Sequence, residues 1–157
     1  MTKVGDKIVL HTHSPEMTEL IGEKLGKALQ PGDLVALEGD LGAGKTVLAR
    51  GLIRGVTGLD VPARSPTFIL TYDYPGPIPL RHADLYRLKT PEELETIVLL
   101  DETSHRRVTV VEWADRLPAE MRNEAILIRI DDVSETEREI SVTARVDIIE
   151  KMKSAVA

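Results

Sequence analysis

Apolar residues occur along the chain either in short continuous runs, which predict buried strands, or three to four residues apart, which predicts helices. The two patterns alternate along the chain. The short apolar run at 33–38 is bounded by turn residues, which is typical of a buried strand in a parallel sheet. Leu48, Leu52 and Val56 then recur four residues apart, which predicts a helix over about 45–54 that fades at the glycines beyond it. The two segments form a strand–loop–helix unit, which is a building block of α/β folds.

Capping residues, turn residues and apolar spacing together predict the remaining helices and strands. Ser14 followed by Pro15 is a helix start, and Thr90 begins a capping box, Thr-Pro-Glu-Glu. Pro75-Gly76-Pro77 joins two β-rich runs as a hairpin. We expect further strands at 7–10, 67–74, 80–85, 108–112, 125–130 and 139–146, and further helices at 15–29, at 90–100 and from about 147. This order predicts an α/β fold whose mainly parallel sheet is flanked by helices and extended by antiparallel strands.

Length and charge narrow the class of protein. The chain has 157 residues, enough for one hydrophobic core, so we expect a single domain over 1–157. Its net charge is −6 and no basic cluster is longer than Arg106-Arg107, which argues against direct binding of nucleic acid. It has no cysteine, which excludes disulfides and thiolate catalysis. No apolar run approaches the ~20 residues of a membrane span, so we expect a cytoplasmic protein without membrane contact, monomeric when alone.

The loop between the first predicted parallel strand and its helix carries the strongest signal. Residues 39–46 read Gly-Asp-Leu-Gly-Ala-Gly-Lys-Thr, a complete G-x-x-x-x-G-K-[ST] phosphate-binding loop. Its small residues let backbone N–H groups approach phosphates, Lys45 neutralises charge at the β/γ positions, and the Thr46 hydroxyl ligates the metal. The sequence therefore predicts a P-loop NTPase-type fold that uses ATP and Mg²⁺. Residues expected to hold the nucleotide are Asp40, Leu41, Gly42, Ala43, Gly44, Lys45 and Thr46, and Lys45 is also expected to be catalytic.

Two acidic residues compete for roles beside this loop. A P-loop enzyme needs an acid for magnesium at the carboxyl end of a strand next to the loop strand. Glu112 ends the buried-type run Val-Thr-Val-Val-Glu and fits this place, although surface glutamates also end strands. Asp84 either acts near the γ-phosphate, as a water-orienting residue or general base, or forms a structural ion pair with Arg87. Spacing alone leaves both interpretations of Asp84 open.

Thr67, Trp113 and the histidines are further candidates for a functional site. Thr67 follows the loop helix, where other P-loop proteins have a segment that orders around the γ-phosphate; a plain turn before a strand is the simpler interpretation. Trp113 is the only tryptophan, and it is either a core anchor or a residue that borders the nucleotide. The histidines show no paired spacing with other ligand types, so we do not expect a transition-metal site at His11, His13, His82 or His105.

Four motifs occur together, in order, in one known family. They are the phosphate loop, Ser65-Pro-Thr-Phe68, His82-Ala-Asp-Leu-Tyr-Arg87 with Pro91-Glu-Glu-Leu94, and Val111-Glu-Trp113. From about Ser14 to Glu112 the chain closely resembles the TsaE (YjeE) family, bacterial ATPases of tRNA threonylcarbamoyladenosine synthesis. The resemblance implies Thr46 and Glu112 as metal ligands, Asp84 as a catalytic acid and Thr67 in a nucleotide-sensitive segment. Ala83 departs from the family, where a bulky apolar residue is frequent, and this leaves the packing beneath Asp84 open.

The resemblance also implies partners. Family members act with the TsaD–TsaB pair, which transfers threonylcarbamoyl to adenosine 37 of tRNA, and are thought to reset or regulate that pair while hydrolysing ATP poorly alone. Contact with tRNA would then be indirect, through the complex, which agrees with the acidic composition. Two alternatives stay open: a small P-loop kinase of a metabolite, and a nucleotide-gated binding module without significant turnover. The absence of an N-K-x-D motif disfavours GTP.

Overall fold

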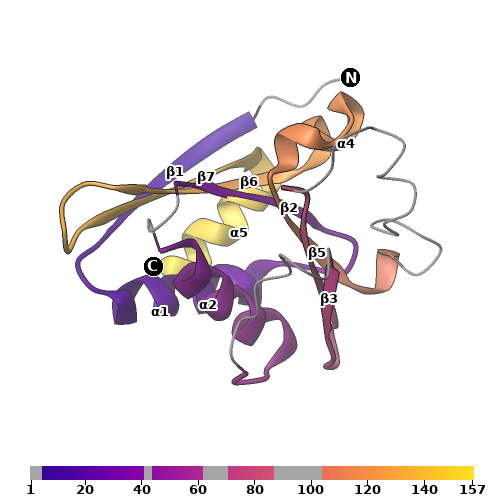
Figure 1. Ribbon diagram of the computed structural model, residues 1–157, viewed down its shortest axis with the longest axis horizontal. Coiled ribbons are helices and arrows are strands. Elements are labelled where there is room, and N and C mark those ends of the chain that lie inside the picture. Colours follow the sequence, from indigo (N-terminus) through magenta and orange to yellow (C-terminus); the bar gives the residue numbers. More distant parts are fainter. Residues whose placement is uncertain (1–4, 41–43, 62–70, 87–103) are drawn as a thin grey trace.

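The computed structural model describes residues 5–40, 44–61, 71–86 and 104–157 (Figure 1). Within these ranges the strands form one seven-stranded sheet in the order β1-β7-β6-β2-β5-β4-β3. The strands are β1 (Gly5–Thr12), β2 (Leu34–Gly39), β3 (Thr71–Tyr74), β4 (Leu80–Asp84), β5 (Val108–Glu112), β6 (Ile126–Asp132) and β7 (Arg138–Arg145). The helices are α1 (Pro15–Ala28), α2 (Lys45–Thr57), α4 (Ala119–Glu124) and α5 (Val146–Val156), with short 3₁₀ turns η1 (Ser104–Arg106) and η2 (Ala114–Arg116).

The centre of the sheet is parallel and its two sides are antiparallel. β6, β2, β5 and β4 run parallel to one another, whereas β7 and β1 on one side and β3 on the other are antiparallel additions. This confirms the predicted α/β class. Because β2 lies between two parallel neighbours, its carboxyl end, where the phosphate loop begins, is flanked by the carboxyl ends of β5 and β6. Ligands collect at this edge in open α/β sheets.

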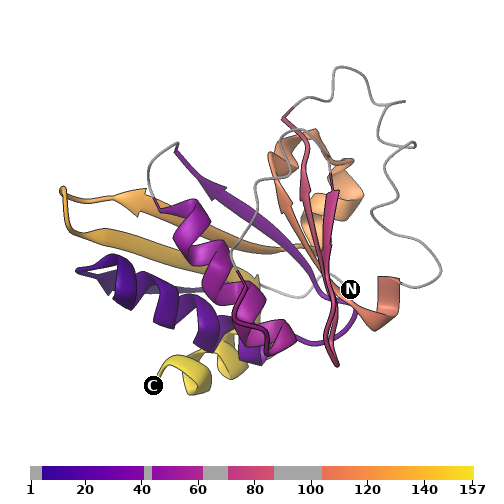
Figure 2. The same cartoon turned by 60° about the horizontal axis from the view of Figure 1, so that its bottom comes forward.

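Helices cover both faces of the sheet (Figure 2). Alternate residues of β2 point to opposite faces, as the period of a strand requires. Val35 and Leu37 join a core made with α1, α2 and α5, whereas Leu34 and Ala36 join a smaller one with η2 and α4. Ala83 is fully buried in this smaller cluster, so a small residue fills the place behind β4.

On the face of the sheet that carries the larger core, α1 and α2 contact each other at glycine residues. A Cβ atom on Gly22 or on Gly26 of α1 would lie 2.6 Å from a carbonyl oxygen of α2, of Leu48 or Leu52 respectively. Gly51 and Gly55 of α2 leave even less room against the backbone of α1. The backbones therefore meet directly, and this contact holds α2, whose first residue is Lys45, against the rest of the fold.

Most predicted elements are confirmed with shifted ends. β1 is longer than the predicted 7–10 because it pairs with β7 over its whole length. α2 was expected to fade near Gly55 but runs to Thr57, since Gly55 is packed against α1 and the helix ends at Gly58, whose φ is 75°. The predicted helix at 90–100 and the start of the strand at 67–74 lie outside the described residues. In the described part of the chain, no helix has the length and apolar character needed to cross a membrane.

Candidate functional site

The two glycines that flank the undescribed part of the phosphate loop have backbone conformations that other residues rarely adopt. Gly39 has φ 156°, and a Cβ atom there would lie 2.7 Å from the carbonyl oxygen of Ile130 on β6. Gly44, with φ 99°, is the N-cap of α2 and supplies no side-chain hydrogen bond to the first turn. The N-terminus of α2 is therefore left without a side-chain cap, in the manner of helix ends that bind phosphate. Asp40 and Thr46 are exposed, and Leu41, Gly42 and Ala43 lie outside the described residues.

Lys45 and Glu112 meet across the carboxyl edge of the sheet. β5 is the neighbour of β2, and in their register Glu112 stands opposite Leu37, just before the loop. The ammonium of Lys45 lies 3.2 Å from Oε1 of Glu112, and both side chains are mostly buried. The prediction that Glu112 ends the strand beside the loop strand is thus confirmed as a placement. Its metal role stays a prediction.

His82 is the residue that sequence reasoning missed. Its Nε2 lies 2.7 Å from Oε2 of Glu112, and the side chain is almost fully buried. Because a carboxylate only accepts hydrogen bonds, Nε2 carries the proton in this contact. The local signal was present, since His82 lies two residues before Asp84 and therefore on the same face of β4. What the sequence lacked was the knowledge that β4 is the neighbour of β5.

These contacts set the charge of Glu112. Burial raises the pKa of the Glu112 carboxyl, but the hydrogen bond and charge of His82, together with the ammonium of Lys45, outweigh burial and leave the pKa below its usual value. Opposite charges and donated hydrogen bonds stabilise the ionised form of an acid. The site therefore keeps a carboxylate anionic at the carboxyl edge of the sheet, which is the form that binds a divalent cation.

Asp84 stands beside Glu112. The two residues are paired in the register of β4 and β5, and their side chains share the face that carries His82. Asp84 is buried, and its Oδ1 accepts a hydrogen bond of 2.8 Å from the backbone N–H of Tyr86. The backbone N–H of Leu85 donates to the carbonyl of Glu112 (3.1 Å), which ties the two strand ends together. Arg87, the alternative ionic partner of Asp84, lies outside the described residues, and so does Thr67.

Trp113 is not a core anchor. It is 42% exposed, has a left-handed backbone conformation with φ 59°, and its ring lies 5.8 Å from the Lys45 ammonium. Its ring packs on that of Tyr86 at 4.9 Å, and the guanidinium of Arg116 lies within 6.0 Å of both rings. Lys45, Trp113, Asp40 and Arg129 are among the residues that line a pocket of about 270 Å³ at this edge. The exposure of Trp113 contradicts the interpretation as a core anchor, and that Trp113 borders the nucleotide stays a prediction.

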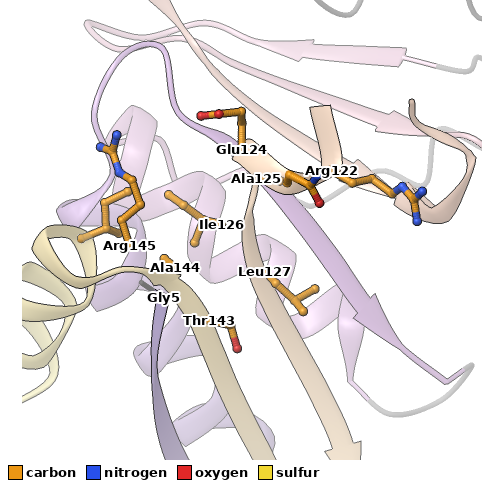
Figure 3. A pocket seen from close by; sticks show the side chains of 11 residues that line it. Gly5, Arg122, Glu124, Ala125, Ile126, Leu127, Thr143, Ala144 and Arg145 are labelled. Atoms are coloured by element: carbon orange, nitrogen blue, oxygen red, sulfur yellow. The ribbon is translucent and has the colours of Figure 1, made fainter. Parts of the chain in front are cut away.

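A larger hollow lies elsewhere. It measures about 570 Å³ and lies where β6 begins and β7 ends, so it is at the edge of the sheet opposite the phosphate loop (Figure 3). Arg122, Glu124, Ile126 and Arg145 are among the side chains around it. None of the described residues that we expect to act on a nucleotide lines this hollow, so its size does not make it the candidate site.

The donor set at the loop fits magnesium bound together with phosphates. Among the described residues no group of three or more acidic or histidine side chains gathers to hold a metal alone. Magnesium in nucleotide sites needs no such cage, since one or two carboxylates, phosphate oxygens and water complete its shell. Glu112, kept anionic, and Thr46, exposed in the first turn of α2, are in accord with that requirement.

A glycine loop between a parallel strand and a helix, a lysine at the helix start and an acid on the next strand together define a P-loop protein. The comparisons with known proteins agree. The family model described as threonylcarbamoyl adenosine biosynthesis protein TsaE matches residues 12–140. The chain belongs to the TsaE family.

Individual relatives support this membership over most of the chain. The Bacillus subtilis protein named tRNA threonylcarbamoyladenosine biosynthesis protein TsaE is 39% identical over 135 residues, which are 85% of this chain and 83% of that protein. A Streptomyces coelicolor protein of the same name is 40% identical over 78% of this chain and 87% of its own length. The crystal structure of Bacillus subtilis YdiB is similar with a TM-score of 0.75 and 29% identity, covering 98% of this chain and 99% of that one.

Proposed function

We propose that the protein is a Mg²⁺-dependent ATPase required for threonylcarbamoyladenosine modification at position 37 of tRNA. In this proposal it acts with the TsaD–TsaB pair and resets or regulates threonylcarbamoyl transfer without contacting tRNA itself. The observation that carries the proposal is the juxtaposition of Lys45, Glu112 and Asp84 at the carboxyl ends of the parallel strands, where Lys45 pairs with Glu112 and Glu112 stands opposite Asp84. Membership of the TsaE family and the names of its relatives support the biological context.

Each residue has a distinct task in this mechanism. The loop backbone and Lys45 bind the phosphates, and Lys45 leaves Glu112 to do so. Thr46 and the freed carboxylate of Glu112 would hold magnesium, which would supply positive charge that stabilises phosphoryl transfer. Asp84, held by the backbone N–H of Tyr86, presents its second oxygen as an acceptor that orients the attacking water. Asp84 and Glu112 end adjacent strands, so the residue that orients the water would lie next to the residue that holds the metal.

The described arginines near the pocket support a need for a partner. Arg116 donates to the carbonyl oxygen of Tyr86 at 2.7 Å, and Arg129 is paired with Asp131 and Glu38. Both guanidiniums are thus engaged within the chain. An arginine supplied in trans can raise phosphoryl-transfer rates by a factor of about 10³–10⁵. We therefore propose slow hydrolysis by the isolated chain and faster hydrolysis in the complex.

The test is phosphate release from ATP by the purified chain, alone and with increasing amounts of the TsaD–TsaB pair. The proposal expects Mg²⁺-dependent release that rises with the pair and disappears in Asp84→Asn. Formation of threonylcarbamoyladenosine over many turnovers should also require ATP hydrolysis and should therefore be lost in Asp84→Asn. Phosphorylation of a small metabolite would favour a kinase instead. ATP-dependent association with the pair that survives in Asp84→Asn and sustains modification would favour a binding module without turnover.

A further inference from the structure

The carboxylate of Glu112 is held from two sides by very different groups. Lys45 contacts Oε1 from a flexible side chain on α2, and His82 contacts Oε2 from a rigid ring on β4. When Lys45 turns to the phosphates, as the proposed function requires, only one of these two contacts is left. We propose that His82 is a positioning residue, which fixes the Glu112 carboxylate in the orientation that binds magnesium. This inference rests on the proposed function.

The register of the sheet explains why a histidine can do this. His82 stands opposite Val110, and Glu112 is two residues further along β5, so the pair is a diagonal neighbour on one face of the sheet. Neighbouring strands lie about 4.8 Å apart and two residues of a strand span about 6.6 Å, so the Cα atoms of such a pair are about 8 Å apart, a gap that long or aromatic side chains can bridge. The imidazole spans this gap with few rotatable bonds. It therefore holds the carboxylate at a small cost in side-chain entropy.

The hydrogen bonding of the ring points to the same role. Nε2 is bonded to Glu112, whereas Nδ1 is buried and has no hydrogen-bond partner among the described residues. A buried imidazole that served only the stability of the core would be expected to use both nitrogens, because an unpaired buried polar atom is unfavourable. In His82 the single hydrogen bond goes to the residue that we expect to bind the metal. Such partners of metal ligands orient the ligand and raise its affinity for the metal.

The experiment measures Mg²⁺-dependent ATP binding, not turnover. Trp113 is the only tryptophan and its ring lies 5.8 Å from the Lys45 ammonium, so its fluorescence is a built-in reporter, with calorimetry as a second readout. His82→Leu removes the donor and keeps an apolar bulk, while His82→Gln can place an amide N–H near the position of Nε2. Thr109→Val, which also removes a buried polar group from the neighbouring strand, is the matched control.

The result expected for His82→Leu is a rise of about 10–100-fold in the Mg²⁺ concentration at half-saturation, the range seen when partners of metal ligands are removed. ATP binding in EDTA should stay within about twofold of the unchanged protein, because Lys45 and the loop are intact. His82→Gln should restore most of the Mg²⁺ affinity, and Thr109→Val should not change it. In a Glu112→Gln background, His82→Leu should have no further effect, since the carboxylate that it positions is gone.

Several results would overturn the inference. An unchanged Mg²⁺ dependence in His82→Leu would do so, and so would an equal loss in the Glu112→Gln background, which would mean that His82 does not act through Glu112. If His82→Leu does not fold, His82→Gln is compared with His82→Asn, whose shorter amide stops short of Glu112; equal Mg²⁺ affinities would then refute the role. If the unchanged protein itself shows no Mg²⁺-dependent ATP binding, the proposed function fails, and that outcome is distinct from the others.

Discussion

The ammonium of Lys45 lies 3.2 Å from Oε1 of Glu112, so the charge expected to meet phosphate is already balanced inside the protein. An unpaired ammonium and an unpaired carboxylate in these mostly buried positions would each be unfavourable. The ion pair avoids both, and phosphates can replace the carboxylate as the partner of the lysine. In the proposed mechanism, nucleotide binding would exchange one ionic contact of Lys45 for another and would release Glu112 for magnesium.

Lys45→Ala should abolish productive ATP binding and leave the fold intact. Charge-assisted hydrogen bonds contribute about 1.5–3 kcal/mol each, so a loss of at least tenfold in affinity is expected. Lys153→Ala, which removes an exposed lysine from α5, is the matched control and should bind ATP normally. Calorimetric titration measures both affinities. Equal ATP affinity in Lys45→Ala and the unchanged protein would refute the assignment of the phosphate loop.

Glu112→Gln and Asp84→Asn should affect different steps, nucleotide binding in the first variant and hydrolysis in the second. Glu112→Gln removes the charge held by His82 and Lys45, so Mg²⁺ dependence and nucleotide binding should weaken together. Asp84→Asn should keep ATP binding and lose hydrolysis, because Asp84 is expected to act on water and not on the bound nucleotide. Binding isotherms and single-turnover hydrolysis separate the two effects. If Asp84→Asn only unfolds the protein, the structural interpretation of Asp84 is the better one.

Gly51→Ala should destabilise the protein although alanine favours helices. A Cβ atom at Gly51 would meet the backbone of α1 near Glu19, so the two helices would have to separate. Overpacking of this kind costs about 1–3 kcal/mol, against a gain of about 1 kcal/mol in helix propensity. Gly58→Ala is the comparison, because no atom lies within 4 Å of its Cβ and only its positive φ opposes the change. A thermal midpoint that rises in Gly51→Ala would show that this contact is loose.

Asp33→Asn should stabilise the protein at neutral pH. Burial raises the pKa of Asp33, and the hydrogen bond from Gln30 and the charges of Lys151 and Arg145 only partly oppose it. The folded protein therefore favours the protonated acid, and the stability that this gives is present at low pH and is lost as pH rises through the raised pKa. The amide keeps an acceptor for the Gln30 N–H, which lies 2.8 Å from Oδ2 of Asp33.

The gain from Asp33→Asn should consequently shrink as pH falls toward the usual aspartate pKa of about 3.9. Thermal unfolding midpoints of both proteins between neutral and acid pH measure this. A difference between the two proteins that is independent of pH would contradict the explanation by burial. Asp131→Asn, an exposed acid paired with Arg129, serves as the control and should not gain stability at neutral pH.

The isolated chain should bind tRNA weakly at physiological salt. The net charge is −6, and of the adjacent basic pair Arg107 is buried, so only Arg106 is available at that place. Non-specific affinity for nucleic acid depends on the number of phosphates that basic side chains neutralise. Filter binding of tRNA to the chain alone, and then with the TsaD–TsaB pair and ATP, measures the difference. Tight binding by the isolated chain would contradict an indirect role.

Sequence alone determined the parts of this protein that depend on local pattern. The glycine-lysine loop, the strand before it and the helix after it were predictable because motif, period and turn residues lie within one short stretch. Glu112 was placed correctly at a strand end for the same reason. The Ser14 cap was also read correctly, since its hydroxyl accepts a hydrogen bond from Met17 three residues away.

Only the tertiary structure decided which of these segments meet. The order of the strands brings β4 beside β5, and this neighbourhood, which no local pattern encodes, joins His82 to Glu112. The contact of α1 with α2 likewise depends on glycines from two distant helices that leave room for one another. Trp113 could be read as a core residue from its type, but its left-handed backbone at the end of β5 turns it to the surface. Local chemistry thus predicts what each residue can do, whereas the packing of the sheet decides which residues act together.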